Sequence, residues 1–140
     1  MNVIIALLDP AHVLHDVAHA WFEGEGQRGW ATCPLTQNGV LRVLGHPQYP
    51  GTGSPNTVAP LLSGLVRSRH HEFWPDDISL LDSARVDSQR LLSAARLTDT
   101  YLLALAAAHG GQLATLDMQL TTEAVRGGTA ALRRIGGSRL

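Results

Sequence analysis

Short apolar runs that alternate with helical stripes constrain the fold of this chain more than any other feature. The run Val3–Leu8 is apolar and partly β-branched, which is typical of a strand buried on both faces of a parallel sheet. Further strands are expected at 30–33, 72–74, 113–116 and 131–135. Strands and helices that alternate in this way predict an α/β fold, a three-layer α/β/α domain with a mostly parallel sheet.

Apolar residues at helical spacing predict the helices between these strands. Asp9 is expected to cap the first helix, with Pro10 in its first turn, and Thr98 is expected to cap the long helix late in the chain. Short helical pieces are expected at 76–84 and 89–95. The four main helices are predicted at 10–24, 35–44, 58–66 and 99–109.

Length and composition predict one domain over residues 1–140. The chain is 44% hydrophobic and has no apolar run long enough to cross a membrane. Cys33 is the only cysteine, so an internal disulfide and a cysteine-based metal site are excluded, and a cytoplasmic location is expected. The net charge of −1 argues against binding nucleic acid by bulk electrostatics. All 11 basic side chains are arginine, which leaves local contact with RNA phosphates open beside simple codon bias.

Two aspartates occupy positions where chemistry is expected in an α/β fold. Asp99 opens the long helix and Asp117 follows a predicted strand, and such positions converge at the carboxyl ends of parallel strands. Carboxylates gathered there repel one another, and a bound Mg²⁺ or Mn²⁺ relieves the repulsion and can activate a water. Structural roles compete with this interpretation: Asp99 as a charge favoured by the helix dipole, and Asp117 as a turn residue.

Four motifs follow one another along the chain, and a Phe-Trp-Pro-Asp-Asp stretch lies between the second and the third. The motifs are Asn2-Val3-Ile4-Ile5-Ala6-Leu7-Leu8-Asp9, Thr32-Cys33-Pro34-Leu35-Thr36-Gln37-Asn38-Gly39, Thr98-Asp99-Thr100-Tyr101-Leu102-Leu103-Ala104-Leu105-Ala106 and Leu113-Ala114-Thr115-Leu116-Asp117. Taken in this order, they resemble the PIN-domain ribonuclease toxins of VapBC toxin–antitoxin pairs, the VapC family. The resemblance covers nearly the whole chain.

This resemblance implies an Mg²⁺- or Mn²⁺-dependent endoribonuclease whose site is an acidic quartet. Only Asp99 and Asp117 match the quartet, and both are implied metal ligands. The first acid would stand two residues before Asn2, ahead of Met1, so the first strand is expected to be truncated. The second-helix glutamate matches Gln37, whose carbonyl brings no charge to a hard cation. Asn2 and Gln37 are the remaining candidate catalytic residues, and weak metal binding with slow RNA cleavage is expected.

Other polar groups have competing interpretations. A zinc site on one helical face competes with a solvent-facing stripe for three histidines, and base stacking competes with packing for His70, His71 and Trp74. Asp76 and Asp77 are expected to start a helix rather than enter the cleft. Phosphate contact is weighed against a solvated face for three arginines. The histidines are His12, His15 and His19, and the arginines are Arg126, Arg133 and Arg134.

Three functions remain open at the level of the sequence. The first is a toxin ribonuclease that uses a metal-activated water. The second is a non-catalytic PIN-like module that binds an antitoxin or RNA, which the neutral Gln37 favours. The third, a receiver-like or hydrolase-like protein, is disfavoured because the chain has no lysine. The resemblance also implies a VapB-like antitoxin, held in a groove that Trp21, Phe22 and Val43 are expected to line, and a two-fold homodimer.

Overall fold

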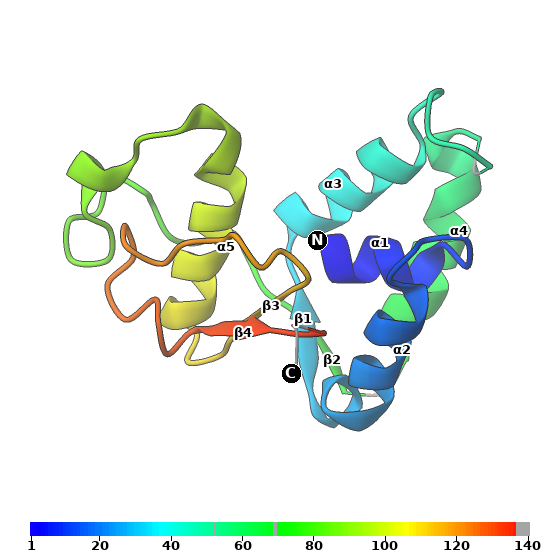
Figure 1. Cartoon of the computed structure of the whole chain (residues 1–140), viewed down its shortest axis with the longest axis horizontal. Coiled ribbons are helices and arrows are strands. Elements are labelled where there is room, and N and C mark those ends of the chain that lie inside the picture. The colour runs from blue at the N-terminus through cyan, green and yellow to red at the C-terminus, as the bar shows by residue number, and fades with distance from the viewer. Residues whose placement is uncertain (52, 69, 137–140) are drawn as a thin grey trace. The chain divides into compact units, whose positions relative to one another are not determined.

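The structure is a computed structural model that describes residues 1–51, 53–68 and 70–136, and these form two compact units, Met1–Asp76 and Asp77–Leu140 (Figure 1). Unit 1 contains α1 (Asn2–Leu8), α2 (His15–Gly24), η1 (Gly26–Arg28), β1 (Trp30–Thr32), α3 (Pro34–Leu44), α4 (Pro55–Val66) and β2 (His71–Phe73). Unit 2 contains η2 (Ser88–Arg90), η3 (Ala94–Arg96), α5 (Leu97–Ala108), β3 (Leu113–Thr115) and β4 (Leu132–Arg134).

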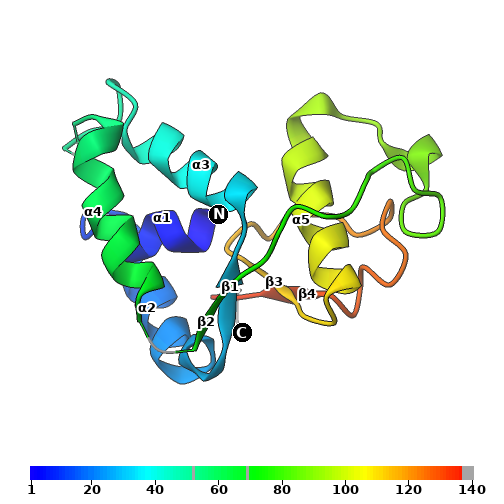
Figure 2. The same ribbon diagram turned by 180° about the vertical axis from the view of Figure 1, so that it is seen from behind.

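Each unit is built around one parallel pair of strands. In unit 1, β1 pairs with β2, and Trp30 lies opposite His71. In unit 2, β3 pairs with β4, and Leu113 lies opposite Leu132. Helices connect the parallel strands of unit 1, and Figure 2 shows α4 leading into β2. The predicted α/β class with parallel pairing is therefore confirmed, as are the strands expected near 30–33, 72–74, 113–116 and 131–135.

The first predicted strand is wrong, because Asn2–Leu8 forms α1 instead. Its buried residues include Val3, Ile4 and Leu7, which recur at helical spacing and face one side. Ile4 packs in a core cluster with Val40 and Leu44 of α3 and with Val58 and Leu62 of α4. Burial against two helices therefore overrides the β preference of the Val-Ile-Ile run.

The core of unit 2 forms around α5. Leu103 is 0% exposed and packs with Ala104 of the same helix and with residues from the surrounding loops, Val86, Leu120, Val125 and Ala131. Because five consecutive residues of α5, Leu102–Ala106, are buried, this helix is covered on nearly all sides rather than along one stripe.

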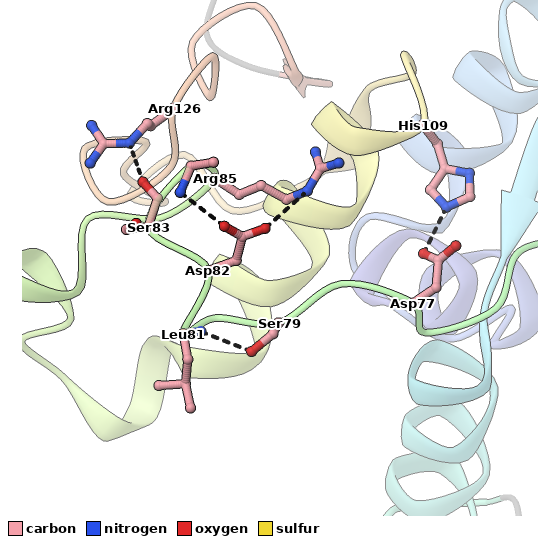
Figure 3. A network of polar contacts seen from close by, with 9 residues as sticks. Asp77, Ser79, Leu81, Asp82, Ser83, Arg85, His109 and Arg126 are labelled. Atoms are coloured by element: carbon pink, nitrogen blue, oxygen red, sulfur yellow. Dashed lines mark hydrogen bonds and ion pairs between the residues drawn. The ribbon is translucent and has the colours of Figure 1, made fainter.

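The segment that opens unit 2 has no helix, although one was predicted over 76–84. Side chains hold it instead (Figure 3): Asp77 pairs with His109 at 3.1 Å, Asp82 pairs with Arg85 at 3.8 Å, and Arg126 Nε donates to the Ser83 carbonyl at 2.8 Å. The predicted piece at 89–95 is replaced by the short 3₁₀ turns η2 and η3. Polar side-chain contacts and single backbone turns, such as the bond from the Asp82 N–H to the Ser79 carbonyl at 3.2 Å, thus take the place of a helix in this segment.

The four main helices that were predicted are present, but two of them do not begin at the expected cap residues. The helix predicted from residue 10 begins at His15, with Leu14 at its N-cap, and Asp9 instead ends α1. Thr98 is not a cap either, because α5 begins at Leu97 with Arg96 at the N-cap. The expected helices at 35–44, 58–66 and 99–109 are confirmed within a few residues as α3, α4 and α5.

No helix within residues 1–51, 53–68 and 70–136 is long and apolar enough to pass through a bilayer.

Candidate active site

Asp99 lies in the first turn of α5 and is half-buried. The unpaired N–H groups of a helix N-terminus favour a negative charge there, so the structural role that the sequence left open is geometrically satisfied. Burial has the opposite effect, because it removes water from the carboxylate. The position therefore combines a favourable backbone field with an unfavourable loss of solvation.

Asp117 follows β3 and is fixed by a turn. Its backbone N–H donates to Thr115 Oγ1 at 3.0 Å, and its Oδ1 accepts from the backbone N–H of Gln119 at 2.8 Å. Thr115 is 2% exposed, so the anchor of this turn lies in the core. Asp117 is thus the turn-forming residue that the sequence allowed, and the same turn gives its carboxylate a fixed orientation.

Electrostatics link the two aspartates. Burial raises the pKa of Asp99 above its usual range, and the negative charge of Asp117 raises it further, whereas Arg96 opposes the rise. A carboxylate whose ionisation is disfavoured by a second carboxylate is a group that a bound cation stabilises. In unit 2, the negative charge of Asp117 disfavours ionisation of the half-buried Asp99.

Arg96 connects the two segments that carry this pair. It is the N-cap residue of α5, three residues before Asp99, and its Nη1 donates to the Gln119 carbonyl at 3.3 Å. Gln119 is the residue whose N–H binds Asp117 Oδ1. One arginine thus ties the turn of Asp117 to the start of α5.

Gln37 lies in unit 1, in α3, where it takes part in a side-chain network. Its Nε2 donates to Thr32 Oγ1 at 2.9 Å, and Thr32 Oγ1 lies 2.8 Å from His71 Nε2. Thr32 is 3% exposed, so this junction is shielded from water. The amide of Gln37 is therefore engaged through its nitrogen.

His71 reaches Thr32 from the neighbouring strand. Its ring packs edge-on against the Trp30 ring, with centroids 4.6 Å apart. Burial lowers the pKa of His71, so the imidazole is neutral at neutral pH. Trp74, for which packing was weighed against base stacking, donates its indole N–H to Glu72 at 3.1 Å.

Asn2 lies in the first turn of α1, also in unit 1. Met1 beside it packs against Gly39 of α3 so closely that a methyl group at position 39 would collide with the Met1 side chain. Gly39 is two residues beyond Gln37. The start of α1 is thus packed on the helix that carries Gln37, which is possible because residue 39 has no side chain.

Asp76 has a different role from the one expected, because no helix starts after Pro75. Its Oδ2 accepts from the backbone N–H of Leu35 at 3.1 Å, in the first turn of α3. Cys33, the N-cap residue of α3, is 2% exposed, and burial raises the pKa of its thiol, with Asp76 raising it further. Asp76 therefore caps α3 from a distance of 41 residues.

The histidine candidates are held by local hydrogen bonds. His12 Nδ1 accepts from the Leu14 N–H at 3.0 Å, His15 Nδ1 lies 2.7 Å from the Ala6 carbonyl, and the rings of His15 and His19 are 4.6 Å apart. Over the part of the chain that the structure describes, no group of three or more His, Cys, Asp or Glu residues is placed to hold a metal ion. A zinc site of three such ligands is therefore absent from that part.

All three arginine candidates donate to backbone carbonyls. Arg126 binds Ser83 in unit 2, as described above, and Arg134 Nη2 donates to the Leu120 carbonyl at 2.6 Å. Arg133 Nη1 donates to the carbonyl of its neighbour at 3.0 Å.

Phe22, expected in an antitoxin groove, is 8% exposed and packs on Trp30, so its assignment to an open groove is wrong.

Sequence reasoning missed Arg96, and it considered His71 only for base stacking or packing and not as a hydrogen-bond partner of Thr32. Arg96 stands three residues before Asp99, and side chains three residues apart are neighbours on the surface of a helix. His71 is 39 residues from Thr32, and only the pairing of β1 with β2 brings them together. The contact of His71 with Thr32 could therefore have been found only by predicting that these two strands pair.

Comparisons with known proteins agree with the motif resemblance. No protein-family model matches the chain, and no solved structure matches it. Ribonuclease VapC44 of Mycobacterium tuberculosis is 46% identical over 129 residues, which cover 92% of this chain and 91% of the relative. Ribonuclease VapC39 of the same organism is 36% identical over 91% of this chain and 92% of the relative. Ribonuclease VapC29 is 39% identical over 85% of this chain and 84% of its own length. Identity of this extent along almost the whole of each sequence shows that the chain belongs to the VapC ribonuclease family.

Proposed function

We propose that this chain is a metal-dependent endoribonuclease toxin of a type II toxin–antitoxin pair, in which Asp99 and Asp117 hold Mg²⁺ or Mn²⁺. The observation that carries the proposal is the coupled carboxylate pair of unit 2, where the charge of Asp117 opposes ionisation of the half-buried Asp99. The names of the ribonuclease relatives support the substrate class, RNA. The expected antitoxin partner comes from the motif resemblance.

The donor set of unit 2 fits a hard cation. Mg²⁺ is commonly bound by one or two carboxylates while it keeps several waters, and Asp99 and Asp117 provide two. When bound, such an ion supplies a water of lowered pKa that can attack a phosphodiester. The protein's own contribution is to hold Asp117 in its turn, to keep Asp99 at the start of α5, and to join both through Arg96.

We further propose that Gln37 and Asn2 contribute to catalysis, as the motif resemblance implies. Gln37 carries no charge where the resemblance implies a glutamate, so it offers the metal a neutral oxygen in place of a carboxylate. A site with fewer charges holds a hard cation less tightly. The chain is therefore proposed to bind Mg²⁺ weakly and to cleave RNA slowly.

A second candidate function is a non-catalytic module that binds an antitoxin or RNA. The observation that favours it is the state of Gln37, whose amide nitrogen is already bonded to Thr32 in a network with His71. In either function, the proposed partners are a VapB-like antitoxin, RNA and a second copy of the chain.

The test is cleavage of a mixed total-RNA and tRNA pool by the purified chain with Mn²⁺. Asp99→Asn is compared with Asp16→Asn, a matched control because Asp16 is an exposed aspartate in the first turn of α2. Cleavage that survives Asp16→Asn and is lost in Asp99→Asn supports the ribonuclease. An absence of cleavage in all three proteins, each of which still binds its antitoxin, supports the binding module.

A further inference from the structure

The hydrogen-bond network at the end of β1 does more than hold Gln37 in place. It also restricts which atom donates the proton in each hydrogen bond. A side-chain amide nitrogen only donates hydrogen bonds, whereas a threonine hydroxyl has one proton to donate and two lone pairs. Gln37 Nε2 therefore occupies a lone pair of Thr32 Oγ1. The hydroxyl proton of Thr32 is left for another acceptor.

His71 Nε2, at 2.8 Å, is that acceptor. Within residues 1–51, 53–68 and 70–136, the side-chain oxygen of Thr32 has these two side-chain partners and is 3% exposed, so water does not compete freely for its proton. The ring of His71 is neutral for the reason given above, and a neutral imidazole has one bare nitrogen. If Nε2 is the bare nitrogen, the ring proton resides on Nδ1.

Packing fixes the other members of the network. Thr32 and Trp30 project from the same face of β1, because side chains alternate along a strand. His71 contacts both of them from β2, since its ring lies against Trp30 and its Nε2 against Thr32. On the helix side, the backbone N–H of Gln37 donates to the Cys33 carbonyl at 3.0 Å, which fixes the start of α3 beside the strand end.

We propose that His71 and Thr32 are positioning residues for Gln37: a relay from Gln37 Nε2–H to Thr32 Oγ1, and from the Thr32 hydroxyl to His71 Nε2, fixes which end of the amide is bound at the strand end. The amide nitrogen is held against Thr32, which leaves the carbonyl oxygen Oε1 as the acceptor that the amide offers to a ligand. This inference rests on the proposed function only for the catalytic use of Oε1; the direction of the relay is independent of it.

The relay predicts what the substitution Gln37→Glu would do. A carboxylate accepts hydrogen bonds and donates none, so the Thr32 hydroxyl must turn toward the new carboxylate. His71 then loses its donor, and its Nε2 must carry the proton to bond Thr32 Oγ1. The tautomer of His71 therefore reports the hydrogen-bonding character of the side chain at position 37, although the two side chains communicate only through Thr32.

The experiment is a long-range ¹H–¹⁵N correlation spectrum of the histidine rings in the full chain at about pH 8.5, where ordinary imidazoles are neutral. The Nδ1–H form of His71 is expected to dominate in the wild-type protein, and the Nε2–H form is expected to dominate in Gln37→Glu. The matched control Gln27→Glu, an exposed residue, is expected to leave His71 unchanged. In a Thr32→Val background, which removes the hydroxyl at similar volume, the side chain at position 37 should no longer affect the tautomer.

Two results would overturn the proposal: a wild-type His71 that is already Nε2–H, or a tautomer that does not respond to Gln37→Glu. The wild-type spectrum alone gives the first of these, so the proposal stays testable even if a variant folds poorly. Because the spectra need neither RNA nor metal, they separate this inference from the proposed function. A tautomer switch in a protein that cleaves no RNA would support the relay and count against the ribonuclease.

Discussion

The two units use the same element, a parallel pair of three-residue strands, and control their polar candidates in different ways. In unit 1, Gln37 is neutral and is controlled by the direction of hydrogen bonds through Thr32 and His71. In unit 2, the candidates are two carboxylates, and burial together with the charge of Asp117 raises the pKa of Asp99. The difference teaches that an uncharged site residue is oriented by proton donors, whereas a charged pair creates a requirement for a cation.

The largest effect is expected from removing a charge in unit 2. Asp117→Asn keeps the shape of the turn and removes half of the carboxylate pair. Loss of a metal ligand is expected to reduce Mn²⁺-dependent RNA cleavage by more than about 100-fold, since even outer-shell partners are worth about 10- to 100-fold. Initial rates on labelled RNA measure this effect. A rate within a factor of about three of the wild type would remove Asp117 from the site.

A large effect on stability is expected at the core of unit 2. Leu103 is 0% exposed, and Leu103→Ala is expected to lower the free energy of unfolding by about 2–5 kcal/mol because it leaves a cavity beside Val86 and Val125. Leu92→Ala is the matched control, because Leu92 is 87% exposed. Urea denaturation of the two variants separates them, and equal losses would show that α5 is not the centre of this core.

A moderate effect is expected from charging position 37 in unit 1. Gln37→Glu adds a carboxylate to the proposed site and is expected to raise the rate of Mn²⁺-dependent cleavage by about 10-fold. Its matched control is again Gln27→Glu. An unchanged rate together with a switched His71 tautomer would place Gln37 outside the catalytic machinery and leave the relay intact.

The smallest effect is a change in stability whose sign separates the two kinds of aspartate. The folded state raises the pKa of Asp99, so protonated Asp99 favours the folded state over the unfolded state. This stabilisation is present at low pH and is lost as the pH rises through the pKa of the folded state. Asp99→Asn mimics the protonated form, so it is expected to stabilise the metal-free chain at pH 7.

Exposed Asp16 is not subject to this burial, so Asp16→Asn is expected to lose only a favourable helix-end charge and to destabilise slightly. Thermal unfolding of both variants at pH 7 and near pH 3 measures the contrast. The advantage of Asp99→Asn is expected to shrink toward the lower pH. Stabilisation that is independent of pH would contradict the electrostatic origin.

The sequence was informative where local pattern decides the structure. The stripe of Val58, Leu61, Leu62, Leu65 and Val66 predicted α4, and Asp99 was correctly placed in the first turn of a long helix. Asp117 was correctly placed directly after a strand. These features depend on neighbours within a few residues, which a sequence displays directly.

Long-range contacts decided what the sequence could not. The run from Val3 is short, apolar and β-branched, and periodicity alone does not distinguish a buried strand from a buried helix in so few residues. Packing of Ile4 on α3 and α4 settled it as α1. Asp76, expected to start a helix locally, caps α3 instead, and His71 meets Thr32 only because β1 and β2 are paired.

The most direct test of the central claim is calorimetric titration of the metal-free chain with Mn²⁺. We expect one weak site, with affinity well short of the low-micromolar range, that is lost in Asp99→Asn and in Asp117→Asn and retained in Asp16→Asn. Binding that persists in Asp99→Asn would contradict the assignment of the carboxylate pair as the metal ligands. Low-micromolar affinity in the wild-type chain would contradict the claim that a neutral Gln37 in place of a glutamate makes a weak site.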